Sequence, residues 1–436
     1  MKLYLDDANY SKLWKRLLFL FVLFFLVLRF IHLDADFPAG ITGSGVLYTD
    51  EGWYANAAIR HYITGEWYLE GDFNPAINMP AGQFLQRVSF ELLGSSLISV
   101  RIMVTIAFIL LVIAATLFVY RRYGYTSALI SASLMVSSHY AFAFSRLGTM
   151  EFIATFFAFS GLLLAWCAFN PLRPVRLLLA AILVSAGILT KTTMIFTLPL
   201  FIYIAWLNEP NLKARYTGSA ILLLVSIGIV GSYFLYIKTL YPGDYTYFKT
   251  LNFDMRSHEN FLHWLAYLPL VILKVGVLGI LFFFLTIYVV VRARKISAEF
   301  RHDPFMKLLF AYVVLYLGML SIVSYGPARY YIPLFVPLVI ICTRACVVLW
   351  KDESLFHGKF KLSKNTTPAV IVLLIVMIGT FRNSIYIMTP EYSFVQMSQQ
   401  VAELIHAREK DLSDVYLLGN FLGIILGIFI DRVANQ

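Results

Sequence analysis

The sequence predicts an all-α polytopic membrane protein with about 11 transmembrane helices. Of its 436 residues, 60% are hydrophobic and 14% are charged. Soluble domains are roughly 45–50% apolar and about 25% charged, so a soluble or disordered chain is excluded. About twenty consecutive apolar residues cross a bilayer as a helix, and such runs recur here. They lie near 17–33, 98–119, 125–144, 151–169, 177–189, 193–207, 218–237, 264–291, 308–325, 331–350 and 368–388.

Three of these runs have special features. The first has basic residues before it and no small-residue cleavage site, so we expect a retained anchor and not a removed signal peptide. The fifth and sixth runs are short and meet at Thr190-Lys191-Thr192. This pattern predicts re-entrant or tilted segments at that point.

Basic residues divide unequally between the two sets of loops. The loops that share a side with the N-terminus hold 19 Lys and Arg in 70 residues, whereas the others hold 11 in 151. Lys and Arg mark the cytoplasmic side of short loops, so the N-terminus is predicted to be cytoplasmic. The net charge of +10 is therefore interpreted as a topology signal and not as a nucleic-acid footprint.

The outer loops are much longer than the inner ones, and the first runs from 34 to 97. A structureless loop of that length is improbable, and helix-like patterns occur at 51–64 and 80–93. We expect interfacial amphipathic helices there, with aromatic rings at headgroup level. These rings are Trp53, Tyr54, Tyr62, Trp67, Phe84 and Phe90. The predicted organisation is a transmembrane domain over 1–388 and an outer C-terminal segment over 389–436, too short for a core of its own.

An acidic pair, Asp50-Glu51, lies just before the first of these expected helices. Adjacent carboxylates point about 100° apart on a helix, so they cannot share one face as an acid/base dyad. One can act as a base while the other orients a partner. A structural interpretation remains open, because an acidic residue at a helix start also caps it and complements the dipole.

Four cations are predicted at the outer ends of different spans: Arg101, Arg146, Lys191 and Arg329. Each taken alone is typical of an interface anchor that extends its charge to water. Four on the same side also suit an anionic headgroup, and Glu151 is placed to pair with one of them.

Other charged residues lie within or near the predicted spans. Lys274 lies deep in the eighth run, where an ionisable group is a functional candidate. Arg29 lies near a span end and is expected to snorkel. No metal site is predicted, since the pattern His258-Glu259…His263 sets its histidines off a shared helix face. There is no Walker motif and no GxGxxG, which leaves a cytosolic nucleotide site unsupported.

Several short motifs follow one another on the predicted outer side. They are Asp50-Glu51, Pro80, Leu92-Leu93-Gly94, Ser99-Val100-Arg101, Ser145-Arg146-Leu147-Gly148-Thr149-Met150-Glu151, Leu189-Thr190-Lys191 and Arg329-Tyr330-Tyr331-Ile332-Pro333. In this order, the region from about 45 to 205 resembles the membrane glycosyltransferases of the GT-C fold, especially the protein O-mannosyltransferases and aminoarabinose lipid A transferases. The family position at Glu151 is more often Asp, and Met79 stands where the aminoarabinose transferases carry Lys.

The resemblance implies transfer of a sugar from a polyprenyl-phosphate carrier to an acceptor outside the cytoplasm, with inversion, in a prokaryotic plasma (inner) membrane. It implies Asp50 as the base, Glu51 as an orienter or second acid, and Lys191 and Arg329 on the donor phosphate. Arg146, Glu151 and Arg101 would shape the site. The sequence leaves open the sugar, the acceptor and whether a divalent metal assists. Two alternatives are a secondary transporter or lipid-carrier flippase, disfavoured by the absence of a repeat, and a non-catalytic scaffold.

Overall fold

The computed structural model describes residues 12–38, 50–68, 74–169, 171–250, 302–323, 328–351 and 366–408. Within these ranges every regular element is a helix, α or 3-10 (η), as the sequence predicts. The elements are α1 (Lys12–Val27), η1 (Leu28–Phe30), α3 (Asp50–Thr64), η2 (Pro75–Ile77), α4 (Pro80–Leu93), α5 (Leu97–Tyr123), α6 (Tyr125–Ser137), α7 (His139–Phe144), α8 (Glu151–Trp166), α9 (Pro174–Thr190), η3 (Thr192–Thr197), α10 (Leu198–Asn208), α11 (Leu212–Leu240), α12 (Pro242–Lys249), α16 (Pro304–Val323), η5 (Ala328–Tyr331), α17 (Ile332–Lys351), α18 (Thr366–Met388) and α19 (Ser393–Arg408).

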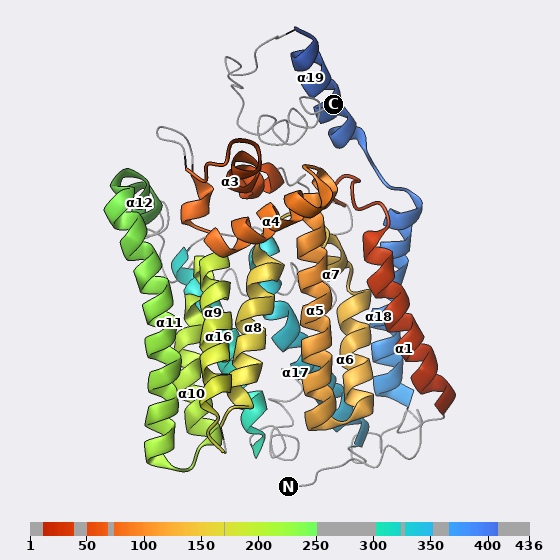
Figure 1. The fold of residues 1–436 in the computed structure, drawn as a ribbon. Helices are drawn as coiled ribbons and strands as arrows, with labels where there is room; N and C mark the ends of the chain where they lie inside the picture. Colours follow the sequence, from red (N-terminus) through yellow and green to blue (C-terminus); the bar gives the residue numbers. More distant parts are fainter. Residues whose placement is uncertain are drawn as a thin grey trace.

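Four helical stretches in the described part are long and apolar enough to cross a membrane. They are Leu97–Tyr123, Leu212–Leu240, Ala328–Val348 and Val372–Leu404. Shorter apolar helices such as α8 and α9 run beside them in one bundle (Figure 1). The chain is therefore an integral membrane protein. The total of about 11 spans stays a prediction, and the expected span at 264–291 lies outside the described residues.

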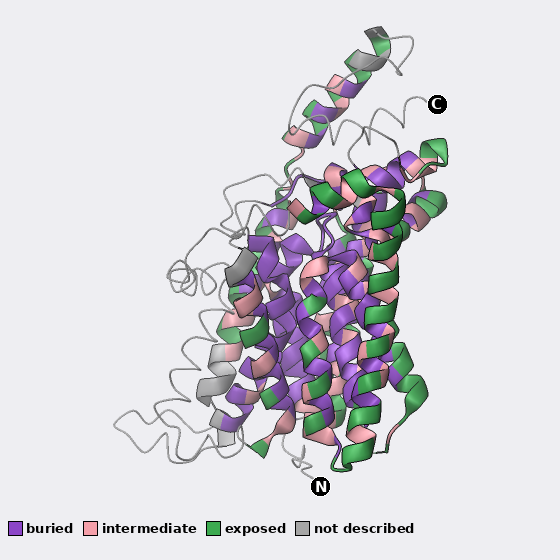
Figure 2. Ribbon diagram, turned by 90° about the vertical axis from the view of Figure 1, so that its left-hand side faces the viewer, coloured by how far each residue is buried: buried purple, intermediate pink, exposed green. Residues whose placement is uncertain are grey.

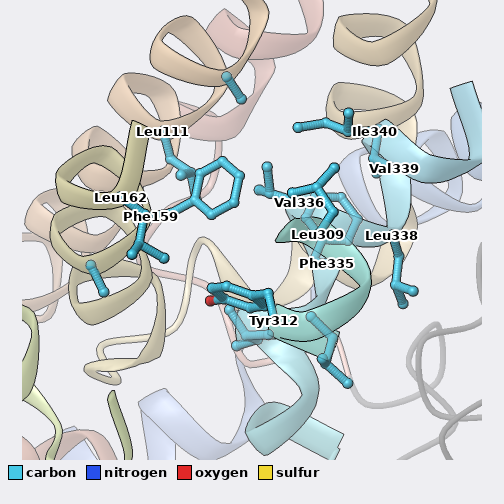
Figure 3. Close-up of a cluster of buried hydrophobic side chains, with 14 of the residues drawn as sticks. Leu111, Phe159, Leu162, Leu309, Tyr312, Phe335, Val336, Leu338, Val339 and Ile340 are labelled. Carbon is cyan, nitrogen blue, oxygen red and sulfur yellow. The ribbon is translucent and has the colours of Figure 1, made fainter. Parts of the chain in front are cut away.

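The interior of the bundle is built around α17. In the stretch Ala328–Val348, 94% of the apolar window is buried, against 17% in Leu212–Leu240. Side chains of α17 such as Phe335 lie among those of α8 and α16, including Phe159 and Tyr312 (Figure 3). Figure 2 shows buried residues in the middle of the bundle and exposed ones along its outer helices. Large exposed apolar surfaces mark contact with lipid or protein, so α11 has the character of a lipid-facing helix.

Two helix breaks interrupt the bundle. The run expected as one span at 125–144 is two helices, α6 and α7, separated at Ser138, whose hydroxyl caps α7. The side chain of Asn383 donates a hydrogen bond to the freed carbonyl of Ser137 at 3.1 Å, as backbone away from water requires. The second break lies where the sequence predicts it, at Lys191, whose backbone is extended between α9 and η3.

Two short helices, α3 and α4, lie at the end of the bundle where α12 and α19 also lie (Figure 1). They occupy the two stretches at which helices were expected, and they pack against each other. Gln83 of α4 inserts into the backbone of α3. Its Oε1 accepts a hydrogen bond from the amide of Ala58 at 2.9 Å, and its Nε2 donates to the carbonyl of Tyr54. Gln83 therefore contacts the donor and the acceptor of one i→i−4 pair of α3 and joins the two helices.

The aromatic rings of this first outer loop do not all face outward. Tyr54 and Phe90 are buried, whereas Phe84 is exposed. The expectation of rings at headgroup level is wrong for Tyr54 and Phe90, because α4 covers one side of α3 and the bundle covers another. The placement of α3 and α4 at a membrane surface stays a prediction.

The segment that follows η1 forms hydrogen bonds with the start of α19, the last described helix. Buried Asp36 accepts hydrogen bonds from the amides of Val395 at 3.0 Å and Phe394 at 2.9 Å. These amides begin α19, so Asp36 acts as a helix cap supplied from a distant part of the chain. The boundary between 1–388 and 389–436 falls between α18 and α19 and stays a prediction, since residues 409–436 lie outside the described residues.

Candidate active site

The predicted site residues gather at the end of the bundle covered by α3 and α4. Their side chains are buried, although they come from separate helices and loops. Those described are Glu51, Arg101, Arg146, Glu151, Lys191 and Arg329. Asp50 begins α3, but its side chain is not among those that the structure describes. Lys274 and the stretch around His258 also lie outside the described residues.

Glu51 is fixed at the start of α3 by three hydrogen bonds. Arg101 donates from Nε to Oε1 at 2.7 Å and from Nη2 to Oε2 at 2.5 Å. The amide of Gly148 donates to Oε1 at 2.6 Å. A side chain at position 148 would not fit, because a Cβ there would lie 2.3 Å from Cγ1 of Val100. Both carboxylate oxygens of Glu51 are therefore used within the protein, which favours the role of orienter over that of second acid.

Arg101 completes this arrangement with backbone acceptors. Its Nη1 donates to the carbonyl of Leu33 at 2.8 Å and also to the carbonyl of Ala35. One side chain thus joins α5, α3 and the segment that leads to Asp36 and α19. These contacts fix the Arg101 side chain where the three segments meet.

Arg146 is held in a similar way. It donates to the carbonyls of His32 at 2.5 Å and Arg29 at 3.2 Å. Its guanidinium lies over the rings of Phe142 and Tyr386, at 4.9 and 5.1 Å from their centres. The sequence predicts a cation at this end of the bundle, but its engagement with backbone carbonyls could not be read from spacing.

A second group joins Glu151, the first residue of α8, to two cations. The Nζ of Lys191 donates to Oε1 of Glu151 at 2.5 Å, and Nε of Arg329 lies 3.5 Å from the same oxygen. In the described part of the chain, Oε2 of Glu151 has no hydrogen-bond partner. Glu151 was expected to pair with one of the four cations, and it contacts two. Lys191 comes from the break between α9 and η3, and Arg329 comes from η5.

Two aromatic rings complete this group. Lys191 Nζ lies 4.3 Å from the ring centre of Tyr330 and 5.7 Å from that of Tyr54. The guanidinium of Arg329 lies 5.5 and 5.7 Å from the same two centres. Tyr54 lies one helical turn after Asp50-Glu51, so it brings the start of α3 beside both cations. Sequence reasoning assigned Tyr54 to the membrane surface and missed this contact.

Arg29 was also misassigned from the sequence. It was expected to snorkel, but it is fully buried, and this expectation is wrong. Its three nitrogens donate to the hydroxyl of Ser145 at 3.1 Å and to the carbonyls of Phe25 and Val136 at 2.8 and 3.1 Å. Ser145 and Val136 lie 116 and 107 positions from Arg29 in the sequence, so its position near a span end did not predict its burial.

Another acidic residue, Asp244 of α12, contacts the later part of the first outer loop. It accepts hydrogen bonds from the hydroxyl of Tyr68 and, at 3.4 Å, from Nδ2 of Asn74. Burial raises the pKa of Asp244 above its ordinary value of 3.8. No ion pair of Asp244 is present among the described residues, in contrast to the two deeper carboxylates.

The part of the chain that the structure describes contains no cluster of three His, Cys, Asp or Glu residues able to hold a metal ion. What the site offers instead is two cations, two aromatic rings and a carboxylate with one unused oxygen. Cations beside aromatic rings suit a phosphate joined to an apolar or sugar group, because the charge and the flat face are recognised separately.

Comparison with known proteins gives one family match. A model described as dolichyl-phosphate-mannose-protein mannosyltransferase matches residues 75–233. This stretch runs from η2 into α11 and contains Arg101, Arg146, Glu151 and Lys191. No curated protein matches the chain in sequence.

Solved structures share the fold. ArnT from Cupriavidus metallidurans, bound to undecaprenyl phosphate, is similar with a TM-score of 0.58 and 15% identity, over 97% of this chain and 75% of that one. The archaeal oligosaccharyltransferase AglB from Archaeoglobus fulgidus, in complex with an inhibitory peptide and a dolichol-phosphate, is similar with a TM-score of 0.60 and 12% identity, over 93% of this chain and 59% of that one. The expected resemblance to GT-C glycosyltransferases is confirmed at the level of the fold.

Proposed function

We propose that the chain is a glycosyltransferase that moves a sugar from a polyprenyl-phosphate carrier to an acceptor on the non-cytoplasmic side. The observation that carries this proposal is the convergence of Lys191 and Arg329 on Glu151 beside Tyr54, one turn from Asp50. The family match and the lipid phosphates bound by the two structural neighbours support the class of donor.

The donor phosphate would be bound by Lys191 and Arg329. In the transfer step the bond between the sugar C1 and the phosphate oxygen breaks, and the electron pair stays on that oxygen. Two fixed cations stabilise the developing charge, so the leaving group needs little acid catalysis. Glu151 holds both cations in place and leaves them able to exchange part of their contact for a phosphate.

The acceptor would be activated at the start of α3. Its hydroxyl or amine attacks C1 from the face opposite the phosphate, which inverts the anomeric centre, and its proton passes to Asp50 as general base. Glu51 cannot easily take that proton, because both of its oxygens accept hydrogen bonds from Arg101 and Gly148. It would instead hold the first turn of α3, and therefore Asp50, against α5.

The test is the Asp50→Asn substitution in the purified full-length chain, assayed with lipid-linked sugars extracted from its host. Asn caps a helix about as well as Asp, so stability should be retained while transfer is lost. Glu66→Gln, an exposed acidic residue beyond the other end of α3, is the matched control and should transfer normally. Normal transfer by Asp50→Asn would remove Asp50 from the mechanism, and lipid translocation without transfer by the unaltered chain would favour the transporter alternative.

A further inference from the structure

Four arginines gather at the end of the bundle opposite the candidate active site. Arg121 and Arg122 end α5, Arg173 precedes α9, and Arg176 lies in the first turn of α9. Arg101 lies near the start of α5 and Arg121 near its end, about 30 Å further along at 1.5 Å per residue. That distance is roughly the thickness of the hydrocarbon core of a bilayer.

Three of the four arginines contact the end of α8 or the turn that follows it. Nη1 of Arg176 donates to the carbonyl of Cys167 at 3.3 Å. The amide of Arg173 donates to the carbonyl of Ala168 at 2.8 Å. The guanidinium of Arg122 lies 5.2 Å from the ring centre of Trp166. Arg121 is adjacent to Arg122 at the end of α5, and Arg173 and Arg176 lie within one helical turn of each other at the start of α9. They therefore belong to one cluster and are not spread around the rim of the bundle.

Positive charge in this cluster is not balanced within the described part of the chain. Asp303 pairs with Arg122 at 2.5 Å. No described carboxylate forms an ion pair with Arg121, Arg173 or Arg176, and these three side chains are exposed. Like charges held close together repel each other, and a bound anion would relieve that repulsion. Guanidinium groups also match the geometry of phosphate oxygens better than ammonium groups do.

Apolar surface leads directly to this cluster. The flanking helices α5 and α9 both pack against α8, which lies between them (Figure 1). In the halves of α5 and α9 that end at the arginines, the exposed apolar side chains include Leu110, Ile113 and Leu117 of α5 and Leu178, Leu179 and Ile182 of α9. On α8 the side chains of Phe156, Ser160 and Leu164 are half-buried, so this helix is recessed between its neighbours. A ligand that fits both features has a phosphate at the arginines and hydrocarbon chains along the helices.

We infer that this cluster binds the headgroup of an anionic glycerophospholipid in the leaflet opposite the candidate active site. The phosphate would contact Arg121, Arg173 and Arg176, and the acyl chains would lie over the recessed face of α8. A soluble phosphate would use the arginines alone and leave the apolar surface unexplained. The inference does not depend on the proposed function, because the two sites lie at opposite ends of α5.

The test is native mass spectrometry of the full-length chain released from nanodiscs containing phosphatidylglycerol and phosphatidylcholine in equal amounts. We expect the unaltered chain to retain phosphatidylglycerol selectively. A basic residue near a membrane surface contributes about fivefold to the binding of anionic lipid, so the triple variant Arg121→Gln, Arg173→Gln, Arg176→Gln should lose roughly a hundredfold in relative affinity. A double variant, Arg121→Gln with Arg173→Gln, keeps the Arg176 contact with the backbone and should lose roughly twenty-five-fold.

The matched control replaces two exposed lysines at the same end of the bundle, Lys213→Gln and Lys307→Gln on α11 and α16. It should retain the lipid as the unaltered chain does. An equal loss in this control, or no loss in either arginine variant, would overturn the inference and leave the arginines as topology signals only. Displacement of the lipid by inorganic phosphate at millimolar concentration would also overturn it, because the ligand would then be a free anion.

Discussion

Two buried acid–base groups lie at the same end of the bundle, and they are built differently. Glu51 accepts three hydrogen bonds, from Arg101 and Gly148, and both of its oxygens are used. Glu151 offers one oxygen to Lys191 and Arg329, and its other oxygen has no hydrogen-bond partner among the described residues. Arg101 is also bound to two carbonyls, whereas Lys191 and Arg329 face the rings of Tyr54 and Tyr330.

This difference suggests that the Glu51 group keeps helices in position, whereas the Glu151 group has capacity for a ligand. A carboxylate and a guanidinium that satisfy each other fully have little capacity left for a ligand, but they define where α3 begins. Two cations that share one carboxylate oxygen can exchange part of that contact for an incoming phosphate. The first group therefore supports the fold of the site, and the second has the free capacity that binding of the proposed donor phosphate would require.

The largest effect on stability is expected from Arg101→Met. This change leaves Glu51 buried without its cation, and an unpaired buried charge costs about 3–5 kcal/mol. The midpoint of thermal unfolding in detergent should fall by several degrees, as measured by intrinsic fluorescence. The double variant Arg101→Met, Glu51→Gln should recover part of the loss, because no charge is then left unpaired. Equal unfolding midpoints for Arg101→Met and the unaltered chain would show that the first group does not support the fold.

Lys191→Met tests the second group, in which Lys191 and Arg329 contact Glu151. Removing one of two groups that stabilise a leaving phosphate should slow transfer about 10²–10³-fold. The unfolding midpoint should fall less than in Arg101→Met, since Arg329 still lies 3.5 Å from Glu151. Lys191→Arg keeps the charge and should restore part of the transfer rate. The comparison would fail if Lys191→Met unfolded as early as Arg101→Met while the folded fraction transferred sugar at the normal rate.

Much of this arrangement follows from local sequence. Amphipathic spacing predicts helices at 51–64 and 80–93, and the short runs around Lys191 predict a break there. The placement of cations at one end follows from the alternation of spans. These features depend on residues close together in the chain, so composition and spacing are sufficient to find them.

Long-range contacts could not be predicted in the same way. Arg101 meets Glu51 fifty positions earlier in the sequence, and Arg29 meets Ser145 across 116 positions. The burial of each helix could not be predicted from the sequence either. Both α11 and α17 are apolar, but α11 is mostly exposed and α17 lies in the interior. In a membrane protein, apolar side chains suit both lipid and core, so hydropathy alone does not distinguish the two environments.

A glycine pair sharpens the comparison at smaller magnitude. At Gly148 a Cβ would lie 2.3 Å from Cγ1 of Val100 and 3.1 Å from Oε1 of Glu51, whereas at Gly228 nothing lies within 4 Å. Gly148→Ala should destabilise the chain by about 1–3 kcal/mol through overpacking and loosening of the Glu51 contact. Gly228→Ala, inside α11, should be neutral or stabilise it by up to about 1 kcal/mol. Thermal unfolding of both variants checks the contrast, and similar midpoints would show that Gly148 is not a close-packed position.

The smallest effect concerns Asp244, a carboxylate hydrogen-bonded to Tyr68 and Asn74. Because burial raises its pKa, folding favours the protonated form, and its contribution to stability falls as the pH rises from about 3.8 through the raised value. Amide exchange in α12, corrected for the intrinsic rate, should show slightly more protection at pH 4 than at pH 7. Asp244→Asn should remove this difference, since the amide does not titrate. A pH difference that persists in Asp244→Asn would assign it to another group. If the pH difference disappears in Asp244→Asn, Asp244 is its source. A half-buried carboxylate hydrogen-bonded to neutral partners then makes a weak, pH-dependent contact, whereas Glu51 is held by an ion pair.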